Sequence, residues 1–311
     1  MTIVVGLPPD LRNWGAMHLA SMLARSARDD LLACAVVPTP WAPSPARVDA
    51  EYRAELARDA NARLEEAGGR MPDDVALSTL VHHARSAPAG LLEVAEQHDA
   101  ALIVVGSSDL AGFGQVIPGS VGSRLMHTSP IPVALPPRGY RVKPVDRVTR
   151  VTAAYGGAEG ADELVVAAAG VAARVGAPLR IASFAVRSRA PYTSGVGTLA
   201  DEAMVAQWVQ EIEVAGRAAL ERVEDLPAVP PKLEAAIGYG HSWEEALEDI
   251  EWQDGDVLVV GSSPMGPVAR VFLGSRAWKI VRSSPVPVMG LPRGTAAELA
   301  GPPAPTGTGT S

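Results

Sequence analysis

The chain has few of the residues that hold small secreted domains together. Among its 311 residues there is one cysteine, Cys34, and aromatic residues make up only 5% of the composition. A single thiol excludes an intramolecular disulfide. The absence of disulfides is usual for proteins of a reducing compartment. Cys34 lies in the apolar run LLACAVVP, so we interpret it as a small buried hydrophobic residue and not as a redox centre. The cores must be built mainly from Ala, Val and Leu.

The sequence also has no basic run and no apolar run of membrane length. Its formal net charge is −8, which argues against nucleic acid or an anionic membrane as the main partner. The longest apolar stretch, 164–173, is far shorter than the about 20 residues that a membrane-spanning helix needs. Met1 leads directly into TIVVG without a basic region or a cleavage-site pattern, so we expect no signal peptide. These absences predict a cytoplasmic protein that binds neither nucleic acids nor membranes.

Two segments of the chain are similar at a constant spacing of 155 residues, which aligns Gly106–Gly139 with Gly261–Gly294. Both contain VVGSS, a later Gly-Ser pair and a closing Ser-Pro-x-Pro-Val, with x being Ile or Val. A period of this length is the size of a domain, so we interpret the chain as a duplicated domain. The predicted divisions are domains at 1–139 and 150–294, a linker at 140–149 and a disordered Pro/Gly/Thr-rich tail at 295–311.

Short apolar runs alternate with longer amphipathic segments in both halves, which is typical of a parallel α/β sheet. The run ALIVV at 101–105 has no polar alternation, as expected for a strand covered on both faces. Pro130 and Pro132 lie at the start of the last run of the first half, so that strand belongs at a sheet edge or pairs only partly. The predicted strands are 3–5, 31–37, 75–81, 102–105, 131–135, 151–154, 179–186, 233–237, 257–260 and 286–289. The predicted helices are 13–28, 48–67, 89–98, 120–128, 161–175, 199–223, 243–252 and 275–282.

The repeated strand, glycine loop and helix start form a pattern that can bind phosphate. Glycines allow backbone N–H groups to approach the phosphates, and the first helical turn has unpaired donors with positive dipole character. A Gly-Ser pair that simply begins and caps a helix is the alternative interpretation. The candidate ligand residues are Gly106, Ser107, Asp109, Gly112, Gly119 and Ser120 in the first half, and Gly261, Ser262, Gly274 and Ser275 in the second.

The two halves resemble universal stress protein domains, and the chain resembles a tandem member of that family. VVGSS, the helix-opening Gly-Ser pairs, and the closing SPIPV and SPVPV carry the resemblance, which extends over nearly all of 2–292. It implies two doubly wound five-stranded parallel-sheet domains of the adenine-nucleotide α-hydrolase-like type, each with strand order 3-2-1-4-5. It also implies that the two last strands face each other in an internal pseudo-dimer. Pairing of two chains into a homodimer is a further option.

The resemblance is incomplete where nucleotide-binding members of the family hold ATP. The second glycine of the family loop is Asp109 in the first half and Pro264 in the second. The aspartate that meets adenine after the first strand is replaced by Pro8 and Gly156. A carboxylate near the phosphates repels them, and proline has no N–H and cannot adopt a positive φ. We therefore expect a degenerate nucleotide loop in each half, more so in the second.

Other catalytic patterns are missing from the sequence. Gly114 and Gly119 have the separation of a P-loop, but Ser120 and Val121 stand where Lys and Ser or Thr are required. His82 and His83 are neighbours directly after the predicted strand 75–81. On a strand their side chains would point to opposite faces, which does not favour a shared metal.

Three functional hypotheses follow from the resemblance and these departures. The first is a non-catalytic stress-response protein that binds a protein partner not identified by the sequence. The second is a stress sensor that binds ATP or another adenine nucleotide, with Mg²⁺, at the first-half loop. The third is a slow ATPase, in which Asp109 would be a carboxylate on the metal side.

Overall fold

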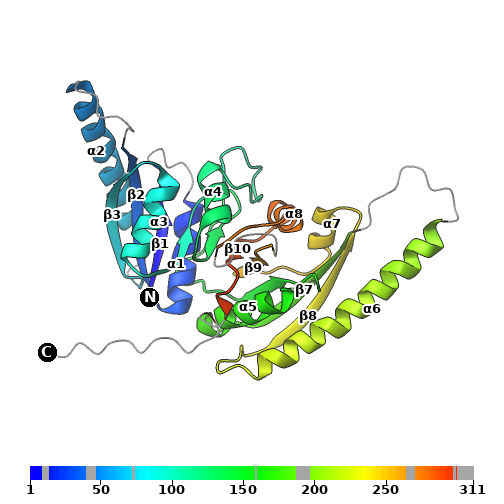
Figure 1. Ribbon diagram of the computed structural model, residues 1–311. Helices are drawn as coiled ribbons and strands as arrows, with labels where there is room; N and C mark the ends of the chain where they lie inside the picture. The colour runs from blue at the N-terminus through cyan, green and yellow to red at the C-terminus, as the bar shows by residue number, and fades with distance from the viewer. Residues whose placement is uncertain are drawn as a thin grey trace.

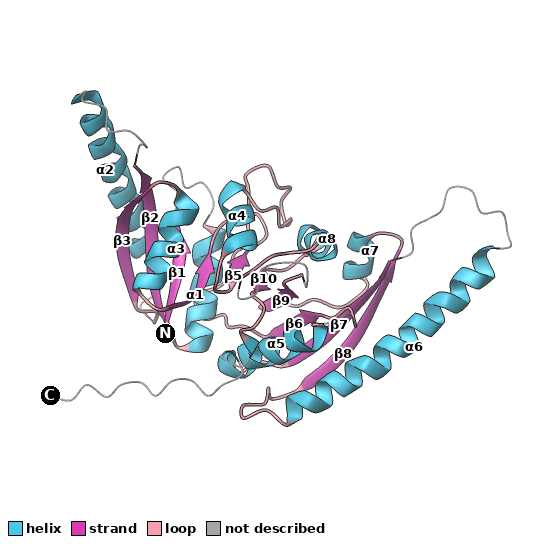
Figure 2. Cartoon of the chain, viewed as in Figure 1, coloured by secondary structure: helices cyan, strands magenta, loops and turns pink. Residues whose placement is uncertain are grey.

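The computed structural model describes residues 1–8, 14–39, 47–71, 74–157, 160–186, 197–263, 270–296 and 299. These residues form a ten-stranded sheet with helices on both faces (Figures 1 and 2). The strands are β1 Thr2–Gly6, β2 Asp30–Pro38, β3 Leu77–Ala84, β4 Ala100–Val104, β5 Val133–Leu135, β6 Arg150–Ala154, β7 Leu179–Val186, β8 Leu233–Gly240, β9 Asp256–Gly261 and β10 Val288–Leu291. The helices are α1 Gly15–Ala27, α2 Arg47–Arg70, α3 Ala87–Gln97, α4 Ser120–Thr128, α5 Ala161–Val175, α6 Gly197–Glu224, α7 Trp243–Glu248 and α8 Ser275–Ser283.

The sheet order is β3-β2-β1-β4-β5-β10-β9-β6-β7-β8. Each half has the predicted order 3-2-1-4-5 with parallel pairing, so the fold prediction is confirmed. The two halves are joined by antiparallel pairing of the two last strands, in the register Val288 with Leu135 and Gly290 with Val133. β5 and β10 are each the last strand of their half and would otherwise leave unpaired backbone groups at a sheet edge. Their antiparallel pairing satisfies these groups and joins the two halves.

Alternation along the central strands builds two cores, one on each face of the sheet. In β1, Ile3 and Val5 pack into one core while Val4 packs into the other. Residues of α1, α2, α5 and α6 contribute to the first core, and residues of α3, α4, α7 and α8 to the second. Cys34 is completely buried in the second core, and this burial raises the pKa of its thiol to about 12. A thiol with so high a pKa is unreactive at neutral pH, which agrees with the structural interpretation of this residue.

Some element bounds differ from the predictions for local reasons. The last strand of the second half begins at Val288 and not at 286, because Pro287 has no N–H and only its carbonyl joins the ladder, accepting from Leu258 N at 2.8 Å. The helix predicted to reach residue 252 ends at Glu248. The indole of Trp252 then donates to the carbonyl of Leu247 at 2.7 Å and so satisfies one acceptor of the last turn.

The segment predicted to be a linker packs closely against the first half. Tyr140 and Val142 contact the first core, and Val148 is buried. The backbone N–H of Val148 donates to Ser26 Oγ at 2.8 Å. This segment therefore holds the C-terminal end of α1 against the start of the second half.

Part of the predicted tail also contacts the protein. Ala296 and Leu299 pack against the first core, and Leu299 N donates to the Thr295 carbonyl at 3.0 Å. Residues 297–298 and 300–311 of the tail lie outside the described residues.

Candidate functional site

The two candidate ligand loops lie beyond the carboxyl ends of β4 and β9, where each loop leads into α4 or α8. Figure 1 shows α4 and α8 on the same side of the sheet, on either side of the β5–β10 junction. In open parallel sheets this edge is where ligands bind. The location of the candidate residues is therefore the one that the motif predicts.

The first serine of each loop is engaged in an internal bond. Ser107 Oγ donates to the Pro136 carbonyl at 2.6 Å, and Ser262 Oγ donates to the Leu291 carbonyl at 2.7 Å. Both pairs are related by the repeat spacing, so this bond is part of the duplicated design. Each hydroxyl ties the loop to the closing strand of its own half, and its proton is not available to a ligand.

The backbone N–H groups of the first-half loop are also largely paired within the loop. Ser108 N donates to the Ile117 carbonyl at 2.7 Å, and Gly112 N donates to Gln115 Oε1 at 3.0 Å. The N–H groups of Leu110, Ala111, Gly114 and Gln115 have partners as well. Ligand binding at these amides would require the loop to break its own hydrogen bonds.

Arg138 holds this loop in place, although none of the ligand motifs in the sequence includes this residue. Its Nη1 donates to the Ala111 carbonyl at 2.6 Å, while the Arg138 carbonyl accepts from Gly114 N at 2.9 Å. The recurrence of Pro-Arg-Gly at 137–139 and 292–294 was the available signal. Arg138 can be interpreted as a loop brace only once the loop is seen folded against it.

The helix starts are the part of the site that remains open. Gly119 precedes α4 and Gly274 precedes α8, and no side chain of the described residues caps either N-terminus by a hydrogen bond. Ser120 and Ser275 are exposed in the first helical position. The unpaired N–H groups of a first helical turn favour anions. These two helix starts can therefore accept a phosphate or another anion without breaking an internal bond.

The remaining candidate ligand residues have fewer described contacts. Asp109 is exposed at the rim of the first loop, and Gly112 is exposed beside Gln115. In the second loop Ser263 N donates to the Phe272 carbonyl at 2.7 Å, the same bond as in the first half, but Pro264 lies in 264–269 and is outside the described residues. Gly261 ends β9, Gly106 lies two residues beyond the end of β4, and both glycines are partly exposed.

The surroundings of the first strands differ between the halves. Pro8 is exposed, and 9–13 lie outside the described residues. In the second half Gly156 is followed by Gly157, at φ 63°, where an added Cβ would lie 2.5 Å from Ile212 Cδ1 of α6. Tyr155 is buried beneath this turn, and its hydroxyl lies 3.2 Å from Asp162 Oδ1. The turn where the family carries its adenine-binding aspartate therefore lies against α6 in this half.

His82 and His83 differ in environment, as the strand alternation predicts. His82 Nε2 lies 2.9 Å from Glu93 Oε2, whereas His83 is exposed. Within the part of the chain that the structure describes, no group of three or more His, Cys, Asp and Glu side chains could hold a metal ion. No described helix has both the length and the apolar character needed to cross a membrane.

Comparison with known proteins identifies the family. The model of the universal stress protein family matches the chain twice, at residues 1–136 and 147–292. This chain belongs to the universal stress protein family. It is 39% identical over 302 residues to universal stress protein Rv2319c of Mycobacterium tuberculosis and, equally, to universal stress protein Mb2346c of Mycobacterium bovis. In both cases 94% of this chain and 100% of the relative are covered, so the relatives share the tandem length.

Solved universal stress protein structures have the same fold. A universal stress protein from Archaeoglobus fulgidus is similar with a TM-score of 0.55 at 19% identity, covering 94% of this chain and 98% of that one. A putative universal stress protein from Pseudomonas aeruginosa gives a TM-score of 0.52 at 16% identity, with 96% of both chains covered. The tandem architecture thus occurs in other members of the universal stress protein family.

Proposed function

We propose that this universal stress protein is a cytoplasmic, non-catalytic binding or regulatory protein of the stress response, with a protein partner. The observation that carries the proposal is the engagement of the first loop with itself. Ser107 and most of the loop amides have internal partners, and Asp109 stands where the family pattern has glycine. A loop with these bonds lacks the free donors that a triphosphate requires. The loop surface instead presents Leu110 and Phe113, exposed to 91% and 85%.

The test is whether the purified protein contains or binds a nucleotide. Denaturing the fresh protein and separating the released small molecules should yield no adenine nucleotide in near-stoichiometric amount. Titration with millimolar ATP and Mg²⁺ in a calorimeter should give no binding heat. A stoichiometric adenine nucleotide in the released fraction would overturn the proposal. A negative result directs the search to affinity capture of protein partners.

The second candidate is an ATP sensor that uses the first-half loop, and the open start of α4 favours it. Here the phosphates would lie on the unpaired amides of the first turn, next to the exposed Ser120. If the bound ATP were also hydrolysed, the protein would be a slow ATPase. A measurement of inorganic phosphate released in the presence of Mg²⁺ would detect this activity.

Asp109 and Ser120 provide the test of a nucleotide at this loop. If ATP binds there, Asp109→Gly and Asp109→Asn should tighten binding about tenfold, because an exposed carboxylate near a phosphate repels it through a screened interaction. Ser120→Ala should weaken binding severalfold, because it removes a hydroxyl donor. Asp225→Asn removes an equally exposed charge in the other half and should leave the affinity unchanged. Binding that responds to neither Asp109 nor Ser120 would exclude this loop as the site.

A further inference from the structure

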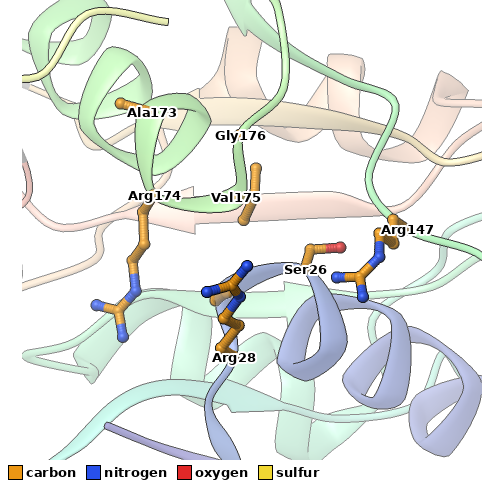
Figure 3. A pocket seen from close by; sticks show the side chains of 8 residues that line it. Ser26, Arg28, Arg147, Ala173, Arg174, Val175 and Gly176 are labelled. Carbon is orange, nitrogen blue, oxygen red and sulfur yellow. The ribbon is translucent and has the colours of Figure 1, made fainter. Parts of the chain in front are cut away.

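A pocket lies at the opposite edge of the sheet from the ligand loops. Helices α1 and α5 end just before β2 and β7, so their C-terminal ends lie at the amino ends of the strands. Together with the segment that joins the halves, they enclose a pocket of about 580 Å³. Figure 3 shows it between the end of α1 and the end of α5. The lining residues are Ser26, Ala27, Arg28, Arg147, Ala173, Arg174, Val175 and Gly176.

The lining contains three guanidinium groups and no carboxylate. One arginine comes from each half and one from the joining segment, and Figure 3 shows Arg28 between Arg174 and Arg147. Arg174 Nη2 donates to both carboxylate oxygens of Asp29, at 2.7 and 2.8 Å, and its Nη1 contacts Met1 Sδ. Arg147 uses Nη1 to donate to the Arg25 carbonyl and keeps its other donors.

Arg28 is the unpaired group among these arginines. It is exposed, and no hydrogen bond or ion pair joins its side chain to any described residue. The charge of the whole chain is −8, so the general field of the protein does not attract anions. Three guanidinium groups face one space whose lining has no carboxylate, with Asp29 paired to Arg174 and Asp74 near Arg147, which makes this a local site of positive charge.

The backbone conformation at Arg28 disfavours a residue with a side chain, so the needs of the fold do not explain an arginine at this position. Arg28 ends α1 in the left-handed region, at φ 58° and ψ 42°. The residue that ends α5 is Gly176, at φ 69° and ψ 28°. Glycine is the usual residue at such a helix end, because a Cβ is disfavoured at positive φ. The first half therefore has an arginine at a position where the equivalent turn of the second half has glycine.

We propose that this junction pocket binds a multivalent oxyanion, namely the phosphate groups of a small phosphorylated molecule. Guanidinium groups match phosphate oxygens with two parallel hydrogen bonds, which makes arginine the preferred residue for this recognition. The ligand would contact Arg28 of the first half, Arg147 of the joining segment and Arg174 of the second half. Binding therefore ties the two halves together on the side of the sheet away from β5 and β10. The site does not depend on the nucleotide loops.

The competing explanation is that the arginines only stabilise the negative ends of the two helices. That explanation predicts that the pocket binds no anion. Inorganic pyrophosphate distinguishes the two, measured by calorimetry and by the thermal unfolding temperature against sodium chloride at the same ionic strength. We expect saturable pyrophosphate binding and a higher Tm in pyrophosphate than in chloride, because a ligand specific to the folded state stabilises it.

Arg28→Gly is the decisive variant, because glycine suits the backbone at this position. It should lower the pyrophosphate affinity at least about tenfold while leaving the Tm of the free protein equal or higher. Arg28→Lys should retain part of the affinity, since lysine keeps the charge but loses the planar fork. Arg85→Ala removes an exposed arginine at the other end of β3 and should change nothing.

Two results would overturn the proposal. One is wild-type protein that responds to pyrophosphate no more than to chloride. The other is pyrophosphate binding of equal affinity in wild type and Arg28→Gly, which would mean that the anion binds elsewhere, for example at the starts of α4 and α8.

Discussion

Replacing Asp256 by alanine is expected to lower the free energy of unfolding by about 3–5 kcal/mol. Asp256 is completely buried, with its carboxylate 2.6 Å from Arg150 Nη2 and 3.8 Å from Arg180 Nη2. Burial, and next the neighbouring Arg150, lower the pKa of Arg180 to about 10. Arg180 therefore remains cationic at neutral pH. Without Asp256, Arg150 and Arg180 would face each other in a water-poor site with Glu234, 3.6 Å from Arg150 Nη1, as the remaining paired carboxylate.

Guanidinium denaturation of wild type and Asp256→Ala measures this effect. Glu66 on α2 provides the control, because Glu66→Ala removes two surface ion pairs, with Arg63 and Arg70, and should cost less than about 1 kcal/mol. A loss below about 1 kcal/mol for Asp256→Ala would show that water or local rearrangement compensates the two arginines. The repeat spacing places Ala101 opposite Asp256, so the first half does without this charge network.

Gly238→Ala is expected to destabilise the protein by about 3 kcal/mol. A Cβ atom at Gly238 of β8 would lie less than 3.0 Å from the Ala246 carbonyl oxygen in α7. This clash involves backbone, so α7 would have to move away from the sheet. Part of that movement would strain the Ser242 cap, whose Oγ accepts from Glu245 N at 3.1 Å.

Gly68→Ala is the matched control for this substitution. Gly68 lies in α2, is exposed, and has nothing within 4 Å of an added Cβ. Alanine should therefore stabilise the helix by up to about 1 kcal/mol. Opposite signs for the two Gly→Ala changes, measured by denaturation, support the close packing of α7 on β8. A neutral Gly238→Ala would contradict it.

The sequence predicted the fold more completely than it predicted the candidate site. Capping chemistry is local, and Ser242 caps α7 as its Ser-x-x-Glu pattern predicts. The Glu245 side chain, however, accepts from His241 N and not from the N–H of the serine itself. Which of two neighbouring N–H groups the glutamate accepts from depends on the path of the chain between the preceding strand and the helix.

The ligand loops illustrate the limit of motif reasoning. Glycine and serine at the right spacing indicated where a loop would follow a strand, and α4 and α8 do begin at Ser120 and Ser275. Spacing does not reveal whether a hydroxyl is free. Ser107 and Ser262 were candidate ligands in the sequence, and both hydroxyls are bonded to the closing strands in the structure.

The sequence by itself determined the duplication and the order of the elements, because apolar periodicity, glycine and proline act over short distances along the chain. The strand order of each half was implied by the resemblance to universal stress protein domains. Only the tertiary structure decided which groups meet across long separations. The register of β5 against β10, the two arginines around Asp256, and the meeting of Arg28, Arg147 and Arg174 all join residues far apart in sequence. Such contacts depend on how whole strands and helices pack, and no local pattern encodes them.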